Sequence, residues 1–261
     1  MKKAFDKETV SEIIDMLTAA RTQAIREGRC PDKTTDKGPK TERDRIKAEK
    51  ADLFARRYSV LAALLGYSAQ SEFPGFETYV CETEAQRNAL NACRRFAQRL
   101  LDRVVDGKNP QIGLLLCGTC GTGKTHLAHA ILRELQKQGA PGYAIGATSY
   151  FDLFTSAFNG HLDAPLPKII KLFAGVSCLV IDDVGTAAWT DARRDRLQQI
   201  LDLREAQRLP TVITTNLKKS DLDMAARLKS RFSGLLYPVV ATWADYRETH
   251  SVRNRTPEEV F

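Results

Sequence analysis

The stretch GTCGTGKT, residues 118–125, has the spacing G-x-x-x-x-G-K-T of a phosphate-binding loop. Its glycines allow the backbone to turn with positive φ and to approach a phosphate without a Cβ in the way. Peptide N–H groups then point into the turn, and the helix that follows adds the positive end of its dipole. The residues predicted to bind the nucleotide here are Gly118, Thr119, Cys120, Gly121, Thr122, Gly123, Lys124, Thr125 and His126.

Two side chains at the end of this stretch predict the ligand. Lys124 would reach the β- and γ-phosphates of ATP as a point charge, and the Thr125 hydroxyl would bind Mg²⁺. The context agrees, because the apolar run 112–117 is typical of a strand buried on both faces, and a helix is predicted from Lys124 to about Gln138. ATP and Mg²⁺ are therefore the predicted ligands.

An acidic pair, Asp182 and Asp183, ends a second apolar run in CLVIDDVG, residues 178–185. Ligands of open parallel sheets bind at the carboxyl ends of the strands. One carboxylate can hold the magnesium shell, and its neighbour can orient or deprotonate the attacking water. The alternative is a pair that caps the next segment. With the phosphate-binding loop upstream, we favour the catalytic interpretation.

Strands and helices alternate after the loop, which predicts an α/β fold with a parallel sheet and crossover helices. The strand predicted at 211–215 can be inserted between the loop strand and the acidic strand. Its end offers Asn216, whose amide would contact the γ-phosphate or hold the lytic water, unless it is a turn residue. Further predicted elements are a strand at 143–147, a helix carrying Phe151, Leu153, Phe154 and Phe158, a strand at 176–181 and a helix at 191–208.

The first quarter of the chain has a different character. Residues 1–66 are charged and contain no strand-like run, and their apolar residues recur near helical spacing. Within them, 26–45 is rich in Gly, Pro and charge and is predicted to be a linker, and a second helix is predicted from Thr41 to Gly66. We expect a small helical N-terminal domain, 1–66, followed by an ATPase domain, 67–261.

Composition limits the class of protein. No apolar run approaches the ~20 residues of a membrane span, and the first ten residues lack the apolar core of a signal peptide, so we expect a cytoplasmic protein. Lys and Arg number 39 against 32 Asp and Glu, a net charge of +7. That excess favours a polyanionic partner such as nucleic acid, although a basic but inert surface is the alternative.

Cysteine and histidine residues near the loop are further candidates for a functional role. Cys117 and Cys120 form a C-x-x-C, but Cys120 lies inside the loop and no second Cys or His pair follows at zinc spacing, so neither a redox nor a zinc site is favoured. His126 and His129 are interpreted as ordinary helix residues rather than catalytic ones, because no carboxylate or cysteine pairs with them in sequence.

Two arginines follow the last predicted strand. Arg227 and Arg231 are four residues apart and so lie on one helix face. That face is either solvated, or it carries an arginine to the γ-phosphate held by a neighbouring subunit, where it would neutralise transition-state charge. In the second case, hydrolysis depends on assembly.

These residues together resemble a known family. GTCGTGKTHLA, CLVIDDVG, VITTNL and RLKSRF match, in order, the Walker A, Walker B, sensor 1 and arginine-finger segments of AAA+ ATPases, and most resemble the DnaC-type helicase loaders. The aromatic-rich segment and helix at 71–100 and the ATWADYRETH segment at 241–250 resemble further parts of those loaders. The likeness covers roughly 73–249.

The resemblance implies roles for several residues. Lys124 and Thr125 would bind ATP and Mg²⁺, Asp182 would support the Mg²⁺, and Asp183 would take the water-activating position. Asn216 would be sensor 1, and Arg231, with Arg227 beside it, would be the finger that acts in trans. The N-terminal region would bind a hexameric replicative helicase of the DnaB type, and the ATPase domains would assemble in a spiral that helps place the helicase on single-stranded DNA.

There are two departures from the family pattern. The usual acidic pair is Asp-Glu, and the shorter Asp183 would lie farther from the water, so slow hydrolysis is expected. No arginine-bearing lid follows Arg231, which agrees with the loader branch and with the related IstB-type transposition ATPases. Those relatives also often carry Asp-Asp. Two alternatives therefore stay open: an ATPase that coats duplex DNA and assists a transposase, and an adaptor that binds nucleotide without hydrolysing it.

Two further sets of contacts are predicted, one with the adenine base and one with DNA. Phe76 and Tyr79 would stack on the base or be core aromatics. Phe158, Lys168 and Lys171 fall where this branch has its pore-facing insertion and would contact DNA, but packing of Phe158 in the core is the favoured alternative.

Overall fold

The computed structural model describes residues 45, 48–49, 52–53, 56, 61, 73–106, 113–140, 142–160, 165–185, 189–216 and 234–246. Most of the predicted N-terminal domain and its linker, together with Arg227 and Arg231, lie outside these residues. From the predicted N-terminal region, Leu61 is described, and its side chain is buried in the core of the ATPase domain.

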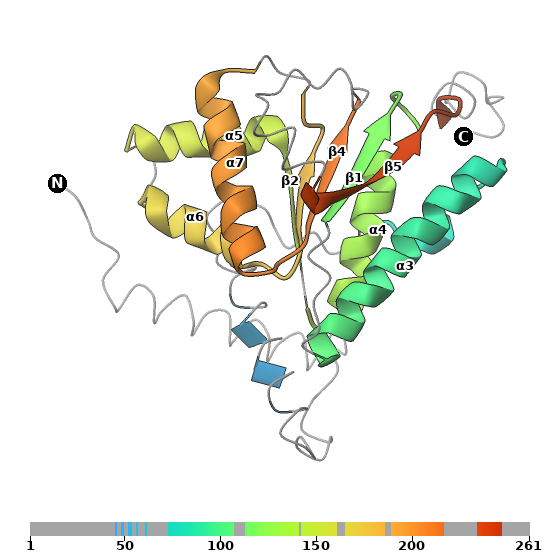
Figure 1. Cartoon of the computed structure of the whole chain (residues 1–261), viewed down its shortest axis with the longest axis horizontal. Helices are drawn as coiled ribbons and strands as arrows, with labels where there is room; N and C mark the ends of the chain where they lie inside the picture. The colour runs from blue at the N-terminus through green and yellow to red at the C-terminus, as the bar shows by residue number, and fades with distance from the viewer. Residues whose placement is uncertain are drawn as a thin grey trace, which may run out of the picture.

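Five parallel strands form one sheet in the order β2-β3-β4-β1-β5. Strand β4 lies between β3 and β1 and pairs with both. The predicted insertion of the 211–215 strand beside the loop strand is therefore confirmed (Figure 1). The strands are β1 (Gly113–Gly118), β2 (Tyr143–Gly146), β3 (Leu179–Asp182), β4 (Thr211–Thr215) and β5 (Leu236–Ala241).

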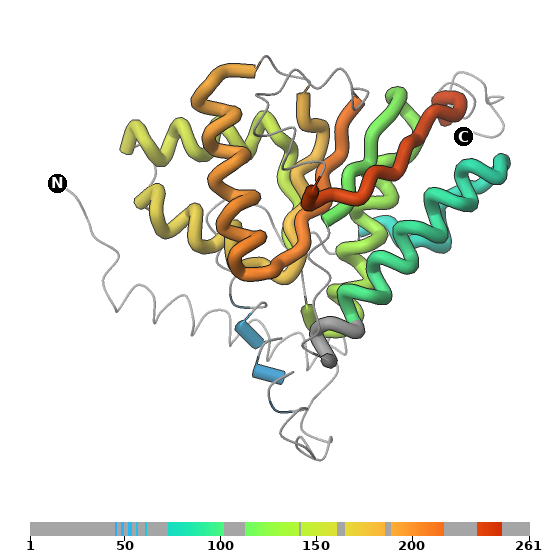
Figure 2. The backbone as a smooth tube through the Cα atoms, viewed as in Figure 1, coloured from blue at the N-terminus to red at the C-terminus, as the bar shows by residue number. Residues whose placement is uncertain are grey.

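Helices cover both faces of this sheet, and Figures 1 and 2 show the two groups on opposite sides. Alternate side chains of β1 lie on opposite faces of the sheet. Leu114 and Leu116 belong to the core under α3 and α4, and Leu115 belongs to the core under α5, α6 and α7. Every residue of β1 is buried, as expected for a strand covered on both faces. The helices are α3 (Glu84–Asp106), α4 (Lys124–Lys137), α5 (Ala147–Phe158), α6 (Leu166–Gly175) and α7 (Asp191–Ala206), with the short 3-10 helix η2 (Phe76–Thr78) before α3.

Strands β1 and β2 and helix α7 differ from the predicted bounds by one or two residues, and two strands differ more. Strand β3 begins at Leu179 rather than residue 176, because the buried residues 176–178 form a bend. Strand β5 was not predicted. It pairs with β1 at the edge of the sheet. Pro238 has no N–H to donate, and an edge strand tolerates proline because one of its sides pairs with no other strand of the sheet. No helix in the described ranges has the length and apolar content needed to cross a bilayer.

A buried arginine joins the ends of α6 and α7. Arg204 is 1% exposed and donates through Nη1 to the carbonyl oxygens of Phe173 at 2.8 Å and Val176 at 3.1 Å. Its Nε donates to Thr211 Oγ1 at 2.9 Å, and Nη2 donates to the Pro210 carbonyl. The planar guanidinium thus donates to the Thr211 hydroxyl and to carbonyl groups of Phe173 and Val176 inside the core. The Pro210 carbonyl also accepts from the N–H of Leu179 at 3.3 Å.

We expect Arg204→Met to lower the free energy of unfolding by about 3 kcal/mol or more, because methionine fills the space but cannot donate to the buried carbonyls of Phe173 and Val176. Urea denaturation followed by circular dichroism measures the change. The matched control is Arg99→Met on the exposed face of α3, which should change stability by less than about 0.5 kcal/mol. Equal losses in the two variants would contradict this account of Arg204.

Candidate nucleotide-binding site

The turn between β1 and α4 lies at the carboxyl end of the sheet, where a parallel α/β fold binds its ligands. Gly121 and Gly123 have φ angles of 68° and 82°, a region that residues with a Cβ adopt only at a cost. Gly123 is the N-cap of α4, and the N–H of Leu127 donates to its carbonyl at 3.0 Å. The backbone amides of the turn and the positive end of α4 thus converge on one place.

Lys124, the first residue of α4, is buried at this turn. Its Nζ donates to the carbonyl oxygen of Gly118 at 3.0 Å and also to that of Thr119. Burial lowers the pKa of Lys124, and the nearby Asp183 and Asp182 carboxylates oppose that effect. A charged amine inside a turn of backbone dipoles is the arrangement that a triphosphate needs.

Thr125 and Asp182 meet across the sheet edge. The Thr125 hydroxyl donates to Asp182, with Oγ1 2.9 Å from Oδ1 and 3.1 Å from Oδ2. Thr214, from the end of β4, donates to Oδ1 of the same carboxylate at 2.5 Å. Hydroxyl and carboxylate oxygens are the donors that Mg²⁺ prefers, usually with one or two protein ligands beside phosphates and waters. This donor set therefore fits a nucleotide-bound Mg²⁺.

Asp183 is held in an unusual conformation next to that carboxylate. Its φ is 60°, which for a residue with a Cβ costs of order 1 kcal/mol. Its N–H donates to Thr214 Oγ1 at 2.8 Å, and Asn216 Nδ2 donates to its Oδ1 at 2.7 Å. Thr214 therefore contacts both members of the acidic pair, a bridging role that its position at the strand end did not indicate. The hydrogen bonds offset the backbone strain and fix the direction of the Asp183 carboxylate.

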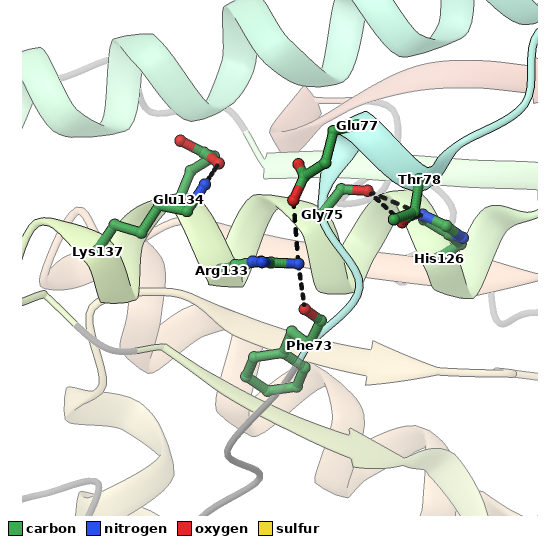
Figure 3. Close-up of polar contacts among 8 residues, drawn as sticks. All are labelled: Phe73, Gly75, Glu77, Thr78, His126, Arg133, Glu134 and Lys137. Carbon is green, nitrogen blue, oxygen red and sulfur yellow. Dashed lines mark hydrogen bonds and ion pairs between the residues drawn. The ribbon is translucent and has the colours of Figure 1, made fainter. Parts of the chain in front are cut away.

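Residues before α3 pack along α4 beside the turn (Figure 3). Arg133 Nη1 donates to the Phe73 carbonyl at 3.2 Å and lies 3.1 Å from Glu77 Oε1. His126 Nε2 lies 3.0 Å from the Gly75 carbonyl oxygen and 3.1 Å from Thr78 Oγ1. His126 therefore anchors this segment to α4, although it was predicted among the nucleotide-binding residues.

The rings of Phe76, Tyr79 and His129 near this segment differ in burial and in the groups that they contact. Phe76 is 6% exposed in the core, with the Arg94 guanidinium 5.8 Å from its ring centre, so its ring is not free to stack on a base. Tyr79 is half-buried against the turn, and its hydroxyl donates to the Thr122 carbonyl at 3.0 Å. His129 packs on Phe73 with ring centres 5.0 Å apart, and burial lowers its pKa.

The remaining predicted residues are spread over other elements. Cys117 is buried in β1 and Cys120 is exposed in the turn, and neither forms a disulfide. Phe158 is 74% exposed at the last position of α5, so the preferred prediction that it packs in the core was wrong. Lys168 and Lys171 are exposed on α6.

The C-terminal side of β5 contributes contacts that sequence reasoning missed. Trp243 Nε1 donates to the Thr122 carbonyl at 3.0 Å, and the N–H of Tyr246 donates to the Gly121 carbonyl at 3.1 Å. The two partners in the first contact are 121 positions apart in sequence. The only sequence signal was the resemblance of 241–250 to a closing segment of the loaders, which gave no contact partner.

The fold and this site define the class: a P-loop protein with the AAA+ ATPase architecture. Residues 91–225 match the family model described as IstB-like ATP binding protein. Because the match covers more than half of the chain, the chain belongs to this family.

Named relatives of this chain act in replication. The replicative helicase loader DnaC of Escherichia coli (strain K12) is 26% identical over 175 residues, which cover 66% of this chain and 68% of DnaC. A crystal structure of the DnaC helicase loader superposes with a TM-score of 0.54 at 26% identity, over 64% of this chain and 96% of that one. A crystal structure of DnaI superposes with a TM-score of 0.55 at 27% identity, over 65% of this chain and 91% of that one.

A more distant likeness extends the fold comparison. AMPPCP-bound DnaA from Aquifex aeolicus gives a TM-score of 0.55 at 20% identity over 63% of this chain. This chain spans 49% of that DnaA chain. At this identity the likeness supports the fold alone.

Proposed function

We propose that this protein is an ATP-dependent loader that binds a hexameric replicative helicase and helps place it on single-stranded DNA. The observation that carries the proposal is the hydrogen-bonded chain Thr125–Asp182–Thr214–Asp183–Asn216 directly beside the Lys124 turn. It supplies a metal-binding pair, an oriented base and a neutral amide in one place. The DnaC and DnaI relatives support the choice of loader among AAA+ functions.

In this proposal, the turn amides and Lys124 bind the β- and γ-phosphates of ATP, and Thr125 and Asp182 hold Mg²⁺. Bound there, Mg²⁺ would neutralise charge that develops on the phosphate oxygens. Asp183, oriented by the Asn216 amide, accepts a proton from water as the water oxygen attacks the γ-phosphorus. The bond between that phosphorus and the β–γ bridging oxygen breaks, giving ADP and phosphate.

Assembly completes the active site in this proposal. Arg231, or Arg227 beside it, would reach the γ-phosphate bound by a neighbouring copy and stabilise the transition state from there. Both arginines lie outside the described residues. Their placement four residues apart, together with the family resemblance, supports this role. ATP would then be hydrolysed only between stacked subunits in a spiral or ring.

Contacts with the partners are assigned to two other regions. Residues 1–66 would bind the helicase. Phe158, exposed at the end of α5, would offer an apolar platform for a base, and the exposed Lys168 and Lys171 of α6 would contact phosphates. An exposed aromatic side chain and lysines are a sequence-tolerant combination suited to single-stranded DNA.

One observation favours a second candidate. The matching family model carries the IstB-like description, and the acidic pair here is Asp182-Asp183. An ATPase that assembles on duplex DNA and assists a transposase would use the same nucleotide site. The two functions differ in the macromolecule that the N-terminal region and the ATP-bound assembly recognise.

The test is co-purification of the full chain with a hexameric replicative helicase of the DnaB type, with and without ATP and Mg²⁺. We expect a complex that is lost when residues 1–44 are removed, a truncation that keeps Leu61 in the core, and tighter binding to single-stranded than to duplex DNA in the ATP state. No complex with any such helicase, combined with a preference for duplex DNA, would contradict the loader function and favour the transposition one.

A further inference from the structure

The segment after β5 lies along the outside of the phosphate-binding turn and contacts it repeatedly. The N–H of Thr119 donates to the Ala241 carbonyl at 3.0 Å, and the Thr119 hydroxyl donates to the Trp243 carbonyl at 3.4 Å. The N–H of Tyr246 donates to the Gly121 carbonyl at 3.1 Å. A short stretch remote in sequence thus follows the turn residue by residue.

One carbonyl of the turn receives two side-chain donors. The Thr122 carbonyl accepts from Trp243 Nε1 and from Tyr79 Oη, each at 3.0 Å. These donors come from opposite ends of the domain, one after β5 and the other before α3. Burial raises the pKa of Tyr79, so its hydroxyl remains a proton donor throughout the physiological range.

The glycines of the turn fit this outer packing. A Cβ at Gly121 would overlap the Asp245 carboxylate, and a Cβ at Gly118 would overlap the Ala241 carbonyl. At Gly123, a Cβ would lie 2.6 Å from Tyr79 Cε2, closer than real Cβ contacts allow. These positions are therefore glycine because protein packs against the outside of the turn, in addition to their positive φ angles.

The hydrogen bonds to the Gly121 and Thr122 carbonyls also fix the direction of the N–H groups that follow them in the chain. In a trans peptide, the C=O of one residue and the N–H of the next point in opposite directions within one plane. With the Gly121 and Thr122 carbonyls bonded to the C-terminal segment and to Tyr79, the N–H groups of Thr122 and Gly123 point away from those partners. These two amides belong to the turn assigned to the phosphates.

A glycine-rich turn without such bonds would sample many conformations, and few of them would bind a triphosphate. The apparent dissociation constant rises in inverse proportion to the population of the competent conformation. Hydrogen bonds that hold that conformation before the ligand arrives therefore increase affinity without touching the ligand.

We propose that Trp243 and Tyr79 are positioning residues for ATP, which act together through the Thr122 carbonyl to keep the amides of the turn directed toward the phosphates. The proposal rests on the proposed nucleotide-binding function and deepens it. It assigns to the C-terminal segment after β5 the task of ordering the phosphate-binding turn.

The experiment compares Tyr79→Phe, Trp243→Phe and the double variant in the full chain. Each substitution removes one donor and keeps an aromatic ring. Two controls remove the same groups elsewhere: Tyr237→Phe at an exposed position of β5, and Trp189→Phe, whose Nε1 has no hydrogen-bond partner among the described residues. Calorimetry measures binding of a non-hydrolysable ATP analogue with Mg²⁺, steady-state kinetics give KM and kcat, and thermal unfolding reports folding.

Each single variant should raise the dissociation constant and KM roughly fivefold, as expected for one lost hydrogen bond. In the double variant, the increase in the dissociation constant should exceed the product of the two single increases, because the Thr122 carbonyl then loses both donors. The value of kcat should stay within about twofold, and the controls should match the wild type. A purely structural role would instead lower thermal stability and leave affinity unchanged.

Two negative results are distinguishable. If the wild type binds the analogue and the double variant binds it equally well, the positioning role is wrong and the nucleotide site stands. If the wild type does not bind the analogue, the proposed function fails and this inference fails with it. Should the double variant not fold, the two single variants decide by the same criterion.

Discussion

The Lys124→Ala variant is expected to bind ATP at least about 100-fold more weakly than the wild type. Lys124 contributes the buried positive charge of the turn, and removing one partner of a buried charge pair typically costs 2–5 kcal/mol, roughly a factor of 30 to several thousand. Calorimetric titration with a non-hydrolysable analogue and Mg²⁺ measures the loss.

Lys137→Ala is the matched control for this variant. Lys137 ends the same helix, is exposed, and pairs at 2.7 Å with Glu134. Its removal should leave ATP affinity unchanged within about twofold, because exposed pairs contribute little. A Lys124→Ala protein that is folded and binds ATP with wild-type affinity would show that the turn is not the phosphate site.

The second large effect is expected on hydrolysis. Asp183→Asn should reduce kcat by at least about 100-fold while ATP binding persists, because the amide keeps the shape of the side chain and its Oδ1 acceptor for Asn216 but cannot take a proton. Asp195→Asn, an exposed position of α7, is the control and should hydrolyse ATP normally. If the wild type itself releases no phosphate in any assembled state, the adaptor alternative is favoured.

Arg231→Ala should likewise retain ATP binding and lose hydrolysis, and mixing it with Asp183→Asn tests where the arginine acts. In a mixed assembly, some interfaces combine an intact Asp183 from one copy with an intact Arg231 from the other. Those interfaces should recover part of the activity if the arginine acts in trans. A mixture as inactive as its components, under conditions where mixed assemblies form, would contradict action between subunits.

The parts of the site that follow a buried strand were predictable from the sequence. Lys124 and Thr125 come directly after an apolar run, and Asp182 ends another, so both lie at the carboxyl edge of a parallel sheet. The insertion of β4 between β3 and β1 then brings Thr214 and Asn216 to the acidic pair. Local pattern and topology rules were sufficient to bring these residues together, but they did not indicate the bridging contacts of Thr214.

Contacts made by residues without such a pattern were not predictable. The contact of Trp243 with Thr122 depends on β5, an edge strand whose exposure does not follow a regular alternation. Arg204 lies in a helix rich in charged residues, yet it is buried, because carbonyls at the end of α6 and before β4 converge on it. Phe158 continues the apolar spacing of α5, but it is the last residue of the helix and its side chain is exposed.

A crystal structure grown with a non-hydrolysable ATP analogue and Mg²⁺ tests the central claim most directly. The account predicts the triphosphate inside the 118–125 turn, with Lys124 on its β- and γ-phosphates and the metal on the Thr125 hydroxyl beside Asp182. A nucleotide bound elsewhere on the domain, or a metal remote from Thr125 and Asp182, would contradict it.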